Sequence, residues 1–223
     1  MGEQITRKNV EKTMNKHKPI GPYEVFFKRM VDIIVSGLVI ILVCWLYLIL
    51  AVLVRINLGS PIIFTQDRPG KDGKAFRLYK FRSMNNKTDE EGGLLPGPMR
   101  LNKFGRILRS TSLDELPELF NILKGDMSLV GPRPEVRHYV NYWTPEQMHV
   151  LDVRPGITDP ASIKYLDENE LLEKAENPEK YYIEVFMQEK IKLYLQYVEK
   201  QSFLYDIALI FKTFWMIVTR ESE

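Results

Sequence analysis

Two adjacent carboxylates, Asp114 and Glu115, are the side chains of this 223-residue chain best suited to do chemistry. The residues that follow are apolar at helical spacing, namely Leu116, Leu119, Phe120 and Leu123. Gly125 then supplies a C-terminal stop, so we expect an amphipathic helix that ends there. The acidic pair lies at its start, where orphan backbone N–H groups favour negative charge, either a carboxylate or a bound phosphate.

Two interpretations of the pair stay open at this point. Ser112 and Glu115 have the spacing of a capping box, in which case the acidic residues only stabilise a helix. Pro117 argues against a helix that begins at Leu113, because a proline that deep in the first turn removes a hydrogen bond. A start near Leu116 would leave the pair on the approach to a helix N-terminus, where it could meet a phosphate.

Arginines next to prolines are the second chemical signal. Arg68, Arg133 and Arg154 each precede a proline, and Arg133 has a proline on both sides. Proline restricts the local backbone, so these side chains have less entropy to lose when they bind an anion. Together with Arg109 they suit bidentate binding of phosphate oxygens, although an ordinary turn with a solvated arginine is the plain alternative for any one of them.

The segment Val31 to Ile56 must position this chemistry, because it is almost wholly apolar and long enough to cross a bilayer as a helix. A buried core helix is the alternative. Both flanks are basic, so both prefer the cytoplasm, which favours a helix that enters the bilayer, bends and returns over one that spans it. A proline would be the natural device for the bend, but Cys44 and Trp45 stand at the middle.

The remaining chain predicts a small sheet and several helices. Short strands are expected at 62–64 and 76–81 around a loop at 66–70, with a surface loop at 85–98 and a helical segment at 100–109. A strand or turn should precede Gly131, and 164–200 has a helical pattern broken at Asn177 and Pro178. The apolar pattern at 207–218 is too short to span a membrane and fits a core helix or an interfacial one.

We therefore expect an α/β, mostly helical, membrane-associated domain with a re-entrant or spanning helix, a small sheet and amphipathic interfacial helices. Its predicted parts are a polar arm at 1–27, the membrane helix at 28–57 and a cytoplasmic catalytic domain at 58–223. The formal net charge of +2 is too small to suggest a nucleic-acid partner. One cysteine and three histidines without ligand-like spacing argue against a disulfide framework and a zinc site.

The chain resembles the small bacterial sugar transferases, which are the monotopic polyprenol-phosphate phosphoglycosyl transferases. The resembling segments are Lys28–Asp32, Phe64–Gly70, Tyr79–Met84, Gly105–Arg109, Ser112–Pro117, Asn121–Met127, Gly131–Pro134 and Val153–Thr158. Two departures stand out. Family members commonly carry Ser-Pro where this chain has Cys44 and Trp45, and glycine where it has Asp159.

The resemblance implies transfer of a sugar-1-phosphate from a UDP-sugar to a polyprenyl phosphate with release of UMP. By motif match Asp114 is the nucleophile that forms a covalent phosphosugar intermediate, and Glu115 assists through a metal or as a general base. Mg²⁺ is the implied cofactor, held by Asp114 and Glu115, since it accepts one or two carboxylates plus phosphate oxygens and water. Lys80, Arg109, Arg133 and Arg154 are then the candidates for binding substrate phosphates.

The implied location is the cytoplasmic face of the bacterial inner membrane, with membrane lipids, a homodimer and downstream glycosyltransferases as further expected partners. Three rival functions remain open. The chain could be a membrane hydrolase of nucleotide sugars, a membrane-anchored scaffold whose acidic pair only caps a helix, or a transferase that works through a ternary complex without a covalent intermediate.

Overall fold

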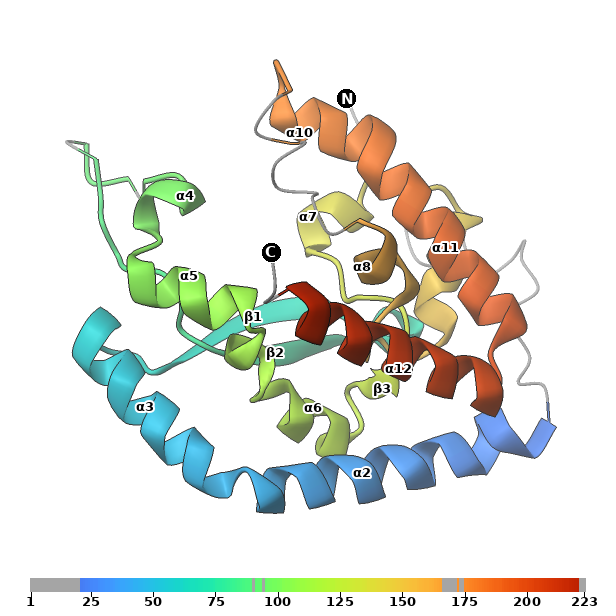
Figure 1. The fold of residues 1–223 in the computed structure, drawn as a ribbon. Helices are drawn as coiled ribbons and strands as arrows, with labels where there is room; N and C mark the ends of the chain where they lie inside the picture. Colours follow the sequence, from blue (N-terminus) through green and yellow to red (C-terminus); the bar gives the residue numbers. More distant parts are fainter. Residues whose placement is uncertain (1–20, 90, 94, 166–171, 173–174, 221–223) are drawn as a thin grey trace. The chain divides into compact units, whose positions relative to one another are not determined.

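The computed structural model describes residues 21–89, 91–93, 95–165, 172 and 175–220 (Figure 1). Residues 1–20 of the predicted polar arm lie outside this range. The chain divides into two compact units, which we describe one at a time. The Asp114 unit comprises Val31–Asp67 and Arg77–Met127, and the Arg133 unit comprises the described parts of Met1–Met30, Arg68–Phe76 and Ser128–Glu223.

Two apolar helices dominate the N-terminal part of the described chain. Helix α2 (Lys28–Leu42) continues the short helical turn η1 (Tyr23–Phe27), and α3 (Cys44–Leu58) follows after one residue. Between them the axis bends by 65° (Figure 1). The bend occurs without proline: Val43 leaves the helical region, and its carbonyl accepts the N–H groups of Leu46 and Tyr47, so α3 begins afresh there.

One side of α3 packs into the core of the Asp114 unit, to which the helix belongs, and the other side is exposed. The buried residues of this core are Leu50, Val54, Leu58, Phe81 and Leu108. The opposite side of α3, and much of α2, is apolar and exposed, as at Leu38, Ile41, Leu48 and Ile56. Within the described residues no single helix has both the length and the apolar character to cross a membrane, but the bent pair taken together does.

The predicted small sheet is a pair of strands, β1 (Ile63–Pro69) and β2 (Ala75–Phe81), joined through the turn η2 (Lys71–Gly73). The prediction of a loop at 66–70 was wrong, because β1 continues through Pro69 and the chain turns after Gly70 instead. Strand ends with polar residues are hard to recognise from sequence, since pairing with a neighbour rather than apolar alternation keeps them extended.

Short helices complete the Asp114 unit. They are α4 (Gly97–Arg100), α5 (Lys103–Ser110), the 3-10 turn η3 (Leu113–Glu115) and α6 (Glu118–Lys124). Gly125 adopts a left-handed conformation with φ 94° and ends α6 as predicted. The capping box is not formed: Ser112 has φ 55° and its side chain makes no capping hydrogen bond, so the pair lies on η3, before a helix that starts after Pro117.

The Arg133 unit contains a second, parallel pair of strands, β3 (Ser128–Val130) and β4 (Gly156–Thr158). The connection between them holds α7 (Arg137–Val140) and the 3-10 segment η4 (Gln147–Asp152). Helices α8 (Pro160–Lys164), α10 (Pro178–Tyr181) and α11 (Met187–Lys200), with η5 (Tyr182–Phe186), cover this core. Asn177 caps α10 and Pro178 is its first residue, which confirms the predicted break.

Helix α12 (Phe203–Arg220) contains the predicted apolar segment at 207–218. Leu209 packs with Val130 and Tyr197 in a small buried cluster, whereas Leu204, Phe211, Phe214 and Trp215 are exposed. The helix is therefore anchored by a narrow face and presents a broad apolar one, a pattern typical of helices at a membrane interface.

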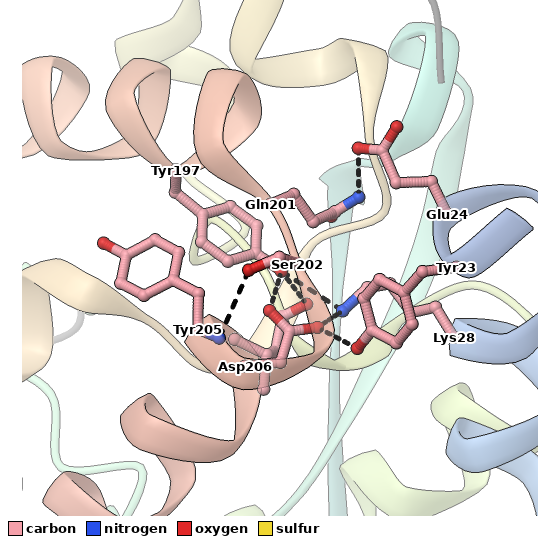
Figure 2. A network of polar contacts seen from close by, with 9 residues as sticks. Tyr23, Glu24, Lys28, Tyr197, Gln201, Ser202, Tyr205 and Asp206 are labelled. Atoms are coloured by element: carbon pink, nitrogen blue, oxygen red, sulfur yellow. Dashed lines mark hydrogen bonds and ion pairs between the residues drawn. The ribbon is translucent and has the colours of Figure 1, made fainter. Parts of the chain in front are cut away.

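A buried polar network ties α12 to the start of the apolar helices (Figure 2). Asp206 pairs with the Lys28 ammonium and accepts hydrogen bonds from the hydroxyls of Tyr23 at 2.6 Å and Tyr197 at 2.8 Å. The Tyr197 hydroxyl also lies 3.1 Å from the Val130 carbonyl, at the end of β3. Next to this network Gln201 donates to Glu24 at 2.6 Å. The mostly helical fold with small sheets is thus confirmed.

Candidate active site

A lysine and two glutamates form the centre of the candidate site in the Asp114 unit. Lys80, on β2, donates to Glu115 Oε1 at 2.6 Å. Its ammonium also lies 3.1 Å from Glu118 Oε1, which is an ion pair by distance rather than an aligned hydrogen bond. Both contacts are largely shielded from solvent, and Glu118 is only 1 % exposed. Shielded ion pairs of this kind are stronger than surface ones, so the three side chains hold one another in place.

Asp114 lies beside this group on a turn whose shape is set by its neighbours. The left-handed backbone of Ser112 and the fixed φ of Pro117 bracket η3. From α3, the Tyr47 hydroxyl donates to the Leu116 carbonyl at 2.7 Å, and its ring packs against Phe81 and Phe120. Asp114 itself is 6 % exposed. A buried carboxylate on a doubly constrained turn is well placed to act as a fixed nucleophile or metal ligand.

Arg109 is the other predicted site residue that lies in the Asp114 unit, at the end of α5. Its Nε donates to Ser83 Oγ at 2.9 Å, and the side chain is otherwise exposed. The helix approaches the chain at Ser83 closely: a Cβ on Gly105 would stand 2.0 Å from the Ser83 carbonyl oxygen. Gly105 is therefore required by packing, and this close approach fixes the distance between α5 and the end of β2.

Arg133 and Arg154 lie in the Arg133 unit, on two loops that touch directly. The Gly156 N–H donates to the Pro132 carbonyl at 2.9 Å, and the Gly131 N–H donates to the Thr158 carbonyl at 3.0 Å. Side chains have no room here, because a Cβ on Gly156 would meet the Gly131 nitrogen at 2.1 Å. The structure thus brings the loops of Arg133 and Arg154 together, a contact that the sequence analysis did not predict.

Arg68, the third Arg-Pro arginine, supports the Arg133 loop. Its Nη1 donates to the Pro134 carbonyl at 2.9 Å and lies 3.9 Å from Glu135. Behind the loop, burial raises the pKa of the Tyr194 phenol and the Asp159 carboxylate adds to the rise, while the charge of Arg133 opposes it. Tyr194 consequently stays neutral, and the Arg133 guanidinium lies near enough to affect its ionisation.

The predicted site residues therefore form two groups, one in each unit: Lys80, Arg109, Asp114 and Glu115 in the first, and Arg133 and Arg154 in the second. Glu118 was missed from sequence, where it resembles an ordinary solvent-facing helix residue. No local sequence signal marks it, because its importance lies in the contact with Lys80 on β2.

The carboxylate oxygens of the Asp114 unit are ligands of a kind that fits Mg²⁺. They are hard oxygen ligands, which this ion prefers. Among the described residues no group of three or more acidic, histidine or cysteine side chains is arranged around a common metal position. A site built from one or two carboxylates would leave the remaining ligands to phosphate oxygens and water, as is usual for Mg²⁺ in phosphoryl transfer.

Comparison with known proteins identifies the family of the chain. A family model described as bacterial sugar transferase matches residues 23–220. The uncharacterized sugar transferase EpsL of Bacillus subtilis is 38 % identical over 196 residues, which are 87 % of this chain and 88 % of that protein.

Two longer relatives carry more specific names. The UDP-glucose:undecaprenyl-phosphate glucose-1-phosphate transferase of Klebsiella pneumoniae is 39 % identical over 87 % of this chain and 41 % of its own length. The UDP-N-acetylgalactosamine-undecaprenyl-phosphate N-acetylgalactosaminephosphotransferase of Aeromonas hydrophila is 36 % identical over 89 % of this chain and 45 % of its own length. The chain thus spans less than half of each. On the match over nearly its whole described length, the chain belongs to the bacterial sugar transferase family.

Proposed function

We propose that this chain transfers a sugar-1-phosphate from a UDP-sugar to a polyprenyl phosphate and releases UMP, as a first membrane step of glycoconjugate synthesis. The observation that carries the proposal is the shielded cluster of Lys80, Glu115 and Glu118 beside the buried Asp114. The names of the Klebsiella and Aeromonas relatives supply the substrate classes.

The proposed chemistry has two displacements at one phosphorus atom. In the first, a carboxylate oxygen of Asp114 attacks the phosphorus that bears the sugar, the bond to the bridging oxygen breaks, and UMP leaves with that oxygen. In the second, an oxygen of the polyprenyl phosphate attacks the same phosphorus, and Asp114 leaves as a free carboxylate. A covalent route lets a water-soluble donor and a lipid acceptor use one nucleophile in turn.

The other residues of the Asp114 unit have supporting roles in this scheme. Lys80 supplies a fixed positive charge against the developing charge on the phosphoryl oxygens. Glu115, held by Lys80, is positioned to accept a proton from an acceptor phosphate that arrives protonated, or to share a cation with Asp114. Mg²⁺, when bound by these carboxylates, would neutralise phosphate charge and so favour attack by an anion.

The arginines complete the proposal as binders of phosphate. Arg109, Arg133 and Arg154 each carry a guanidinium, which is suited to bidentate contacts with a diphosphate or an acceptor phosphate. The touching loops around Gly131 and Gly156 hold their backbones rigid, so little entropy is lost on binding.

We further propose that the bent helix pair enters the membrane and returns to the same face. The pair begins in the Arg133 unit, where Tyr23 and Lys28 bond Asp206 and Tyr197, and the chain that follows α3 is back in that unit from Arg68, which bonds Pro134. A helix that crossed the bilayer would separate its flanks by about 30 Å of hydrocarbon. The exposed apolar faces of α2, α3 and α12 supply the surface that would be buried in lipid.

This topology would place the catalytic part on the cytoplasmic face of the inner membrane, because the basic flanks favour that side. There UDP-sugars are available and polyprenyl phosphate can reach the site laterally. A homodimer and contacts with downstream glycosyltransferases stay predictions.

The deciding experiment measures UMP release by the purified full chain in detergent or nanodiscs, with Mg²⁺ and a panel of UDP-sugars. Wild type should turn over one donor continuously when polyprenyl phosphate is present, and should release about one equivalent of UMP per enzyme without it. Asp114→Asn should abolish both, whereas Asp89→Asn, the same change in an exposed loop, should keep full activity.

The rival functions give different results in the same assay. Continuous UMP release without lipid acceptor would identify a hydrolase. Absence of the single-equivalent burst, with normal turnover when acceptor is added, would point to a ternary complex. Full activity of Asp114→Asn would mean that the acidic pair only stabilises the helix and takes no part in catalysis. Absence of turnover with every donor would overturn the proposed reaction.

A further inference from the structure

The outer edge of strand β2 requires a hydrogen-bond partner. Ile62 bonds Arg82, and Gly70 bonds Lys74, so even-numbered residues of β2 direct their backbone groups toward β1. The N–H and C=O groups of odd-numbered residues therefore point to the opposite edge. Among the residues that the structure describes, no third strand pairs with that edge. Unpaired backbone groups are costly once buried, so a partner must come from elsewhere.

Asn121, on α6, is that partner. Its Oδ1 accepts the Tyr79 N–H at 3.0 Å and its Nδ2 donates to the Arg77 carbonyl at 2.8 Å. A single side-chain amide thus replaces a peptide group of a third strand. Nδ2 also lies 3.3 Å from Asp126 Oδ2, and the residue is 0 % exposed.

The position of Asn121 relates directly to the catalytic cluster. Glu118 precedes it by three residues, so both side chains lie on one face of α6. Along β2, Lys80 directly follows Tyr79. The helix is therefore attached to the strand at two adjacent points, Asn121 with Arg77 and Tyr79, and Glu118 with Lys80. A shift of α6 along β2 would break both attachments together.

We infer that Asn121 is a positioning residue for the transfer reaction: by bonding the edge of β2 it fixes the register of α6 against the strand and so keeps Lys80 between Glu115 and Glu118. This inference rests on the proposed function, because its effect is read in that reaction. Asn121 itself touches no reacting atom in this assignment. It acts through Lys80.

Amide hydrogen exchange tests the contact without reference to activity. The Tyr79 N–H should exchange at least about 10-fold faster in Asn121→Ala than in wild type, because its acceptor is lost. Asn177→Ala is the matched control, since it also removes an asparagine acceptor, the N-cap of α10, and thereby weakens a helix end away from β2. Unchanged exchange at Tyr79 in Asn121→Ala would overturn the inference, and so would equal acceleration in Asn177→Ala.

Activity then tests whether Asn121 acts through Lys80. Asn121→Ala should lower kcat about 10- to 100-fold, as expected for a displaced catalytic group, with KM for the donor changed by less than about threefold. In a Lys80→Met background the same substitution should change kcat by less than about twofold. A general loss of structure would instead lower kcat by similar factors in both backgrounds, and that result would reduce Asn121 to a structural role.

A variant that keeps part of the contact makes the test decisive if Asn121→Ala does not fold. Asn121→Ser brings no charge into this buried position, and its hydroxyl can keep one of the two bonds to Arg77 and Tyr79. It should show a smaller kcat loss that again disappears in the Lys80→Met background, and a loss that persists there would contradict the inference. If wild type releases no UMP with any donor, the proposed function fails while the exchange result still reports on the contact.

Discussion

Lys80 is the residue on which the charge balance of the candidate site depends. It faces Glu115 and Glu118, and Asp114 adds a third carboxylate on the same turn. These four side chains carry one formal positive and three formal negative charges when all are ionised, so they alone would repel an anionic diphosphate. Additional cations are therefore needed for binding, which is a physical reason to expect both Mg²⁺ and arginines in the reaction.

Replacing Lys80 by methionine should consequently lower kcat by about 10²- to 10³-fold, the usual cost of removing one preorganised charge from a site of phosphoryl or acyl transfer. Lys124→Met is the matched control, because Lys124 is an exposed lysine whose ammonium bonds the Tyr79 hydroxyl and lies over the Tyr79 ring. Its kcat should stay within about twofold of wild type. Equal effects of the two substitutions, measured as UMP release, would remove Lys80 from the site.

At the scale of elements, apolar spacing predicted the helix that ends at Gly125 and the long apolar segment, because both depend on local periodicity. It could not predict the pairing of β3 with β4, since strands of three residues carry no periodic signal and their contact is distant in sequence. The positive φ of Ser112 was equally unpredictable, because it is imposed by the packing around η3.

Some residues of the candidate site could likewise be predicted from the sequence, and others could not. Motif resemblance pointed to Asp114, Glu115 and Lys80, and the structure brings Lys80 to Glu115. Glu118 and Asn121 needed coordinates, because their importance lies in contacts with β2 that no local pattern reveals.

The Lys28–Asp206 pair links α2 to α12 within the Arg133 unit (Figure 2), with side chains that are 12 % and 5 % exposed. Removing one partner leaves a buried charge without its counter-ion, so Lys28→Met and Asp206→Leu should each destabilise the protein by about 3–5 kcal/mol. The double substitution should cost less than the sum of the two, because both charges are then gone.

Thermal unfolding of the three variants in detergent measures this coupling. Additive losses would mean that the pair contributes no mutual stabilisation. The exposed pair Lys192–Glu189 on α11 offers a control, since surface pairs contribute about 0–1 kcal/mol and its removal should barely change the unfolding temperature.

For the whole molecule, the two units share the N-terminal helices: α2 begins in the Arg133 unit and continues into the Asp114 unit with α3. Tyr47 on α3 bonds the turn that carries the acidic pair. The apolar helix α3 is thus part of the Asp114 unit rather than a separable anchor. The re-entrant route that we propose would decide where the site meets a lipid acceptor.

The re-entrant route predicts that both flanks of the helix pair face the same side. Pro22 and Lys71 are exposed and belong to one compact unit, so single cysteines there should react together. In a Cys44→Ser background, Pro22→Cys and Lys71→Cys should both be labelled by an impermeant maleimide in inside-out vesicles, and both protected in right-side-out ones. Labelling in opposite vesicle types would establish a spanning helix. That outcome would also separate Tyr23 and Lys28 from Asp206, so the network of Figure 2 could not exist in the membrane-bound protein.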